Sequence, residues 1–191
     1  MSTVFIDVDT QLDFLFPSGA LYVPGAERIV PAVARLNRYA AANNIPIIST
    51  TDAHTESDPE FKVWPHHCVA GTLGQRKAEA TLLPNRIVIP NRAVPIDLAP
   101  QIVVEKQTVD VFQAPNLSRV IDRLAADRFV VYGVVTEICV LYAVRGLAKL
   151  GKPVTVVTDA IETLSEVNSR QALEEARSLG ATLSNSHEIC A

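Results

Sequence analysis

The chain has 191 residues, a net charge of −4 and 48% hydrophobic residues, which favours one compact α/β domain over residues 1–191. No stretch approaches the about 20 apolar residues of a membrane helix and no secretory segment opens the sequence, so we expect a cytoplasmic protein with no membrane partner. The acidic balance and the lack of a basic block argue against nucleic acid and favour a small-molecule partner.

The first elements are a strand, a helix and a second strand. Thr3–Val8 is an apolar, β-branched run that predicts a buried strand, with three carboxylates in it or just after it: Asp7, Asp9 and Asp13. A helical spacing of apolar residues then runs from Ile29 to Ala40. The strand expected at 45–50 again leads into chemically able side chains, Asp52 and His54.

Residues 58–100 contain six prolines and predict loops that carry function. A short strand at 102–105 follows and delivers Lys106 at its carboxyl end. The run 128–135 is the most β-rich, and Thr136 is expected to cap a helix from Glu137 to Leu150.

The C-terminal elements continue the alternation. We expect a strand at 153–158, a helix opened by a capping box of Thr163 and Glu166 and ending near Gly180, and a last strand at 181–184. Alternating strands and helices predict a three-layer αβα, Rossmann-like domain with a central, mostly parallel sheet.

Three residues at expected strand ends have the chemistry for acyl transfer. Cys139 would lie near the start of a helix, where free N–H groups and a neighbouring Lys106 ammonium would lower the thiol pKa. Asp9 could take the thiol proton, and N–H groups of Cys139 and the 134–136 turn could hold an oxyanion. The alternatives are a core cysteine, a capping aspartate and a solvated lysine.

Three of the four histidines cluster with acidic residues. His54, His66 and His67 lie between Asp52 and Cys68, together with Asp58 and Glu60. Carboxylates and imidazoles suit zinc, iron or manganese, so the cluster predicts one divalent metal ion. The alternatives are surface histidines that bind nothing, or a structural zinc held through Cys68. The chain has three cysteines, and this odd number argues against a disulfide framework.

Four ordered motifs resemble the isochorismatase-like cysteine hydrolases, and they span almost the whole chain. Residues 9–14 resemble the D-x-Q-x-D-F signature, and 52–54 the D-x-H metal motif. Residues 134–140 resemble the V-x-T-x-x-C-V part of the nucleophile segment G-V-x-T-x-x-C-V. Residues 64–72 are similar to the W-P-x-H-C-V-x-G-T element of nicotinamidases.

The resemblance implies roles for these positions. It implies a catalytic triad of Asp9, Lys106 and Cys139, and metal ligands at Asp52, His54, His67 and Glu60. It also implies a cis peptide at about Val134–Val135, with the N–H groups of Val135 and Cys139 as the oxyanion hole. Phe14, Trp64 and Phe112 would contact the substrate ring.

The resemblance implies an amidase that acts on nicotinamide in NAD salvage. The implied metal is zinc, with iron or manganese as alternatives. Whether the protein forms a homo-oligomer stays open. The segment 75–79 departs from the acidic and aromatic continuation of many nicotinamidases. Another carboxamide or carbamoyl substrate therefore stays an alternative. So does a non-catalytic metal-binding or redox-responsive member of the same fold. An isochorismate-like ether is disfavoured, because isochorismatases lack the cysteine.

Overall fold

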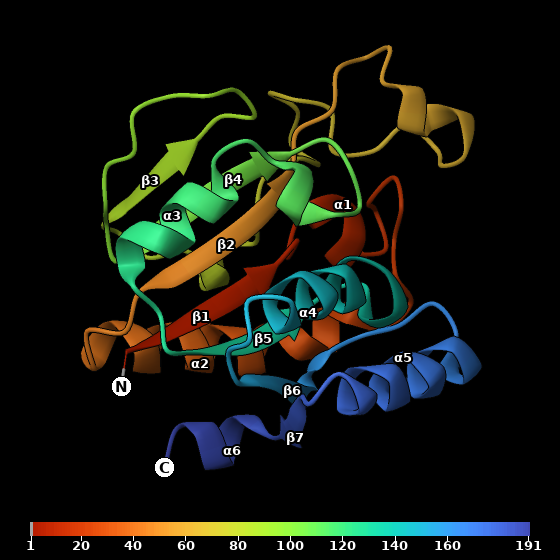
Figure 1. The fold of residues 1–191 in the computed structure, drawn as a ribbon. Coiled ribbons are helices and arrows are strands. Elements are labelled where there is room, and N and C mark those ends of the chain that lie inside the picture. Colours follow the sequence, from red (N-terminus) through yellow and green to blue (C-terminus); the bar gives the residue numbers. More distant parts are fainter. Residues whose placement is uncertain (1) are drawn as a thin grey trace.

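The computed structural model describes residues 2–191, in which a seven-stranded sheet forms the middle layer (Figure 1). The strand order is β3-β4-β2-β1-β5-β6-β7, and every pairing is parallel. The strands are β1 (Thr3–Val8), β2 (Ile47–Asp52), β3 (Arg86–Ile89), β4 (Gln101–Lys106), β5 (Arg128–Gly133), β6 (Val154–Ile161) and β7 (Thr182–Ser184). The expected α/β fold with a mostly parallel sheet is confirmed.

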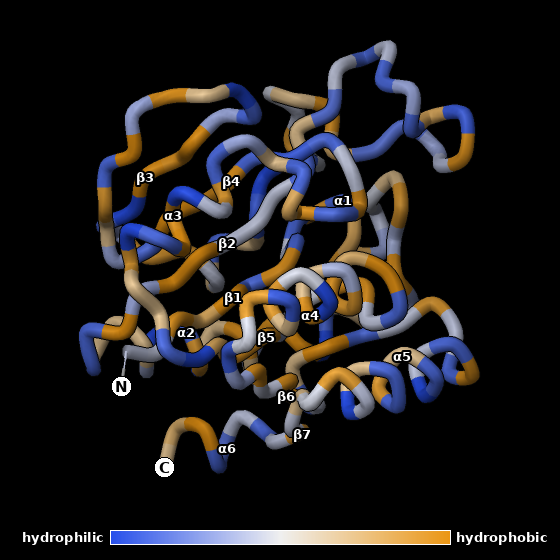
Figure 2. Tube along the Cα trace, in the orientation of Figure 1, coloured by the Kyte–Doolittle hydropathy of each residue, from blue (hydrophilic) through white to orange (hydrophobic). Residues whose placement is uncertain are grey.

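Helices cover both faces of the sheet because the strands alternate apolar side chains between the two faces. Val4 and Ile6 of β1 belong to a core shared with α3 (Leu117–Leu124) and α4 (Leu141–Ala148), whereas Phe5 packs into the core beneath α2 (Val30–Ala42). Figure 2 shows the central strands β1 and β5 largely in the hydrophobic colour, as expected for strands buried on both faces. Three further helices complete the layers: α1 (Leu12–Leu15), α5 (Glu166–Ser178) and α6 (Ser186–Ile189).

Two predicted helix starts are wrong. The Thr136 hydroxyl donates to Glu162 O at 2.8 Å and caps nothing; Thr136 is itself the first residue of a π turn, Thr136–Val140, that precedes α4. Helix α5 is capped by Ser165, whose hydroxyl accepts the Asn168 N–H at 3.3 Å, so the expected capping box does not form.

The Pro-rich middle is largely loop, as expected, with short 3-10 turns such as η2 (Pro59–Lys62). It also contains β3, which the sequence reading missed. Helix α3 was not expected either. No helix within residues 2–191 is long and apolar enough to cross a membrane.

Candidate active site

Four neighbouring strands bring the candidate residues to one edge of the sheet. Asp52 is the last residue of β2 and pairs in register with Lys106, the last residue of β4. Asp9 directly follows β1, with a positive φ of 48°, and Cys139 lies in the π turn after β5. Because β4, β2, β1 and β5 are consecutive in the sheet, these side chains meet at their carboxyl ends.

The Lys106 ammonium lies at the centre of this group. Its Nζ is 2.9 Å from Asp9 Oδ2 and 3.8 Å from Cys139 Sγ, and it also donates to Asp52 Oδ1. All four residues are buried, with Cys139 the most exposed at 8%. The acid and the thiol that the sequence singles out thus both lie within contact distance of the amine.

The thiol environment differs from the sequence expectation. Burial raises the pKa of Cys139 well above its ordinary value; Lys106 opposes that shift, while the carboxylates of Asp9 and Asp52 add to it. Burial would lower the pKa of Lys106, but Asp52 and Asp9 raise it well above its usual range. These two shifts favour a neutral thiol beside an ammonium.

The backbone around Cys139 turns sharply. The Val134–Val135 peptide bond is cis, at the position that the resemblance implies. Val135 O then accepts the N–H groups of Ile138 at 3.0 Å and Val140 at 3.1 Å, which closes the π turn that carries the thiol. The turn is hence anchored to the end of β5 by its own backbone.

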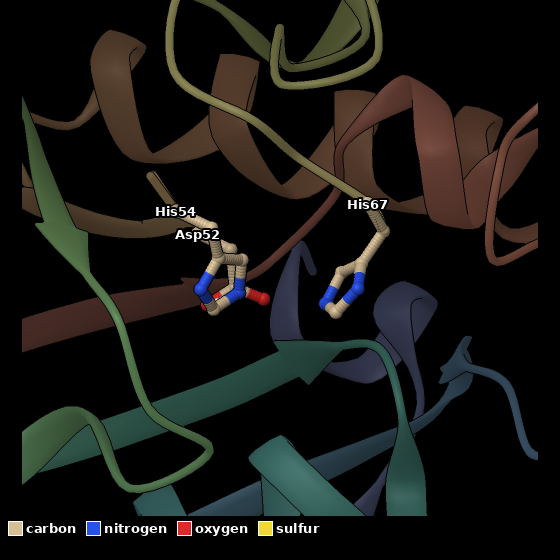
Figure 3. Close-up of side chains that lie close together, drawn as sticks. All are labelled: Asp52, His54 and His67. Carbon is tan, nitrogen blue, oxygen red and sulfur yellow. The ribbon is translucent and has the colours of Figure 1, made fainter. Parts of the chain in front are cut away.

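Three of the expected metal ligands form a compact buried group. One ligand atom from each of Asp52, His54 and His67 lies within 4.8 Å of the others, and Figure 3 shows the His67 ring turned toward the other two side chains. His67 Nδ1 is 2.7 Å from Pro65 O, which leaves its Nε2 for another partner. Both ring nitrogens of His54 are buried and have no hydrogen-bond partner among residues 2–191, although Nδ1 lies 3.0 Å from Asp58 Oδ2.

These donors fit a divalent ion. Two imidazoles and a carboxylate are a usual zinc ligand set with room for a further ligand. Burial raises the pKa of Asp52 to about 7, with Asp9 adding to the shift and Lys106 opposing it. An ion at this point would compensate the charge of that carboxylate and satisfy an unpartnered His54 nitrogen.

Other members of the histidine cluster lie apart from this group. Glu60, on η2, lines a cavity together with Asp52 and His67, and burial raises its pKa. His66 is exposed and stacks on Phe61 with ring centroids 4.2 Å apart. The Cys68 N–H donates to Asp13 at 2.6 Å, and Cys68 is not part of the compact group, which disfavours a zinc held through that thiol.

A cavity opens above these groups and is mostly apolar. The ionisable residues in its lining are Asp52, Glu60, His67 and Cys139. Its apolar wall includes Phe14, Leu21, Val23, Trp64, Val109 and Leu164. Of the three expected ring contacts, Phe14 and Trp64 line the cavity.

Phe112 is not among the cavity-lining residues, contrary to expectation. It packs against Gly146 of α4, where a Cβ atom would lie 2.0 Å from the Phe112 ring. Val109, a few residues earlier in the same segment, reaches the cavity instead.

Several residues for which the sequence predicts no role support the site through hydrogen bonds. Gln11 bonds both backbone groups of Asp52, accepting the N–H at 2.7 Å and donating to the carbonyl at 2.9 Å. Asp13 accepts the N–H of Cys68, next to His67. The Thr50 hydroxyl donates to Asp9 Oδ1 at 2.5 Å. Polar residues within a strand-end motif are the signal that would have found Gln11 and Asp13.

Two solved structures of known proteins are similar to this chain over nearly its whole length. A pyrazinamidase/nicotinamidase from Streptococcus mutans UA159 has 27% identity and a TM-score of 0.82 over 96% of this chain and 100% of its own. A Pyrococcus horikoshii pyrazinamidase, solved in complex with zinc, matches at 27% identity and TM-score 0.82 over 97% of this chain and 99% of its own.

A third relative has another activity. An N-carbamoylsarcosine amidase from Arthrobacter sp. is 26% identical over an alignment of 155 residues, which covers 78% of this chain and 55% of that protein's length. The profile of the isochorismatase domain matches residues 3–188. The chain therefore belongs to the isochorismatase domain family.

Proposed function

We propose that this protein is an amidohydrolase that cleaves a small aromatic carboxamide, nicotinamide in the first instance, through a thioester on Cys139. The observation that carries the proposal is the contact of one ammonium, Lys106 Nζ, with both Asp9 Oδ2 at 2.9 Å and Cys139 Sγ at 3.8 Å. Of these groups Cys139 lines the mostly apolar cavity, together with Asp52, which also contacts Lys106.

The first half of the reaction forms the acyl-enzyme. Asp9 accepts the proton of the Cys139 thiol, and Lys106 stabilises the thiolate as its charge develops. The sulfur attacks the carboxamide carbon, and the N–H groups of Val135 and Cys139 hold the oxyanion. Asp9 returns the proton to the nitrogen, the C–N bond breaks, and ammonia leaves.

The second half regenerates the thiol. Water attacks the thioester carbon with Asp9 as the base, the C–S bond breaks, and the sulfur recovers a proton from Asp9. The product is the carboxylic acid, nicotinic acid from nicotinamide. A divalent ion would be held by Asp52, His54 and His67, with Glu60 as a further ligand. The ion would be zinc, or else iron or manganese, and would supply a Lewis acid at the cavity.

The cavity wall favours an uncharged aromatic substrate. Phe14 and Trp64 offer flat apolar surfaces, and among the described residues the lining includes no arginine and no lysine. Lys106, which is not among the lining residues, is already paired with Asp9 and Asp52. A carbamoyl amino acid such as N-carbamoylsarcosine carries a carboxylate, which would find no arginine or lysine in that lining to pair with.

Ammonia release tests this assignment with nicotinamide, pyrazinamide, N-carbamoylsarcosine and maleamate as substrates, and metal analysis of the same sample. We expect turnover of the two aromatic amides, its loss in Cys139→Ala, and its retention in Cys190→Ala, a matched change at the partly exposed thiol near the C-terminus. Turnover of N-carbamoylsarcosine alone would assign the other activity. Full activity of Cys139→Ala would refute the nucleophile.

A further inference from the structure

We propose that Asp58 is a positioning residue of the metal site, which fixes the orientation and tautomer of His54 and couples that ligand to Glu60. The inference rests on the metal site proposed above and is independent of which amide the protein cleaves. Asp58 belongs to none of the catalytic, metal-ligand or cavity-lining groups described so far.

The first contact sets the protonation of the His54 ring. Asp58 Oδ2 lies 3.0 Å from His54 Nδ1, and both side chains are buried, at 7% and 0% exposure. The two atoms do not have the geometry of a full hydrogen bond, so Nδ1 is also without a hydrogen-bond partner within residues 2–191. A carboxylate this close repels a ring lone pair and attracts an N–H, and a neutral imidazole has one N–H, so the contact favours the proton on Nδ1. The lone pair is then on Nε2, the nitrogen that lies 3.9 Å from Asp52 Oδ1 and has no hydrogen-bond partner within residues 2–191.

The second contact reaches Glu60. Asp58 Oδ1 accepts the Glu60 N–H at 3.0 Å and so caps the 3-10 turn η2. Phe61 of the same turn packs on the His54 ring, with centroids 5.3 Å apart. The Asp58 carboxylate therefore contacts the His54 ring and also holds the turn that carries Glu60, the proposed fourth ligand.

His67 shows the same arrangement with a different partner. Its Nδ1 lies 2.7 Å from the Pro65 carbonyl, so a backbone oxygen orients that ring. Asp58 is thus the charged side chain that performs this task in the site, and a charged acceptor also makes the ring a stronger donor to a cation. Removing it should weaken binding of the ion without removing a ligand.

Asp58→Asn separates the two contacts. The amide oxygen can still cap η2, but the amide nitrogen donates, which favours the tautomer with its proton on His54 Nε2 and blocks that ligand atom. Asp58→Ser is a second variant that retains a capping hydroxyl and is too short to reach the ring.

Asp110→Asn is the matched control. Asp110 caps the 3-10 turn η4 (Val111–Gln113) by the same type of bond, with its Oδ1 accepting the Phe112 N–H at 3.0 Å, and it is outside the metal group.

The experiment titrates zinc alone into metal-free protein against a competing chelator, and records the visible absorption of the cobalt-loaded protein. We expect Asp58→Asn to bind zinc about 10–100-fold more weakly and to change the cobalt spectrum, with Asp58→Ser affected in the same direction. Asp110→Asn should match the wild-type protein. The thermal midpoint of each metal-free variant shows whether the fold is intact.

Equal zinc affinity of Asp58→Asn and wild type would overturn the inference, as would an equal loss in Asp110→Asn or no zinc binding by the wild type. Ammonia release is measured separately. Weakened zinc binding in Asp58→Asn together with no amide turnover by the wild type would uphold this inference and refute the proposed function.

Discussion

The Thr50 hydroxyl of β2 donates a 2.5 Å hydrogen bond to Asp9 Oδ1, and its oxygen accepts the Asp9 N–H at 3.2 Å. One carboxylate oxygen of Asp9 is thereby held in place, and the other, Oδ2, is directed to Lys106 at 2.9 Å. Thr50 is fully buried, so this arrangement is protected from water. The orientation of the proposed base is set by its neighbouring strand.

Replacing Thr50 should consequently impair turnover. In Thr50→Val the shape is kept but the donor to a charged group is lost, at a cost of about 1.5–3 kcal/mol, and we expect kcat to fall about 10- to 100-fold. Thr50→Ser, which keeps the hydroxyl, should recover most of the activity. Steady-state kinetics on nicotinamide measure both. Wild-type kcat in Thr50→Val would show that the bond has no role in positioning Asp9.

Asp9→Asn should separate thiol reactivity from catalysis. The Asp9 carboxylate raises the pKa of Cys139, both by its charge and by its hydrogen bond. Without that charge the pKa falls, more thiolate is present at a given pH, and alkylation of Cys139 by iodoacetamide should become faster near neutral pH.

Ammonia release by the same variant should nevertheless be lost, because the proton acceptor is gone. Alkylation rates followed by mass spectrometry at the Cys139 peptide, compared with Cys190, provide the measurement. A slower alkylation of Cys139 in Asp9→Asn would contradict the electrostatic description of the site.

Lys106→Met should destabilise the metal-free protein. The change leaves the buried carboxylates of Asp9 and Asp52 without their common cation, and breaking a buried pair in this way costs about 3–5 kcal/mol. Lys77→Met is the comparison, since Lys77 pairs with Asp7 at 3.3 Å in an equally buried site that holds no proposed catalytic group.

Denaturant unfolding should therefore show losses of similar size in both lysine variants. Ammonia release measured on the folded fraction should be abolished only in Lys106→Met. An unchanged unfolding free energy in Lys106→Met would mean that the three charges do not interact as the contacts indicate.

The histidine cluster gives a test of the ligand set. His54→Ala and His67→Ala should each lower the bound metal per chain, because both rings belong to the compact buried group. His66→Ala should leave the metal content unchanged, since His66 is exposed and stacks on Phe61. Elemental analysis after dialysis against zinc distinguishes the three variants. Loss of metal in His66→Ala would require a different ligand set.

Strand-end residues could be predicted from sequence because each follows a strongly apolar run. Thr3–Val8 is the observed extent of β1, and Lys106 ends β4 as expected. The carboxyl ends of parallel strands converge by topology, so proximity of these residues needs no knowledge of distant contacts.

The errors involve contacts between segments far apart in the chain. Thr136 does not cap the following helix because its hydroxyl donates to the backbone carbonyl of Glu162, 26 residues away. Phe112 turns into the core because Gly146 leaves space for its ring. Strand β3 was missed because its short apolar run lies between Pro84 and Pro90, in a Pro-rich segment that predicts loops. Burial, which governs the pKa of Cys139, also has no local sequence signature.

The most direct test of the central claim uses pyridine-3-carboxaldehyde, labelled with ¹³C at its carbonyl carbon, as an analogue of nicotinamide. If Cys139 is the nucleophile, the sulfur adds to the aldehyde and the labelled carbon gives a tetrahedral-carbon resonance in the protein-bound state. That resonance should be absent in Cys139→Ala and present in Cys190→Ala. An aldehyde that inhibits nicotinamide turnover yet keeps its trigonal-carbon resonance, or gives the same adduct in Cys139→Ala, would contradict covalent catalysis by this thiol.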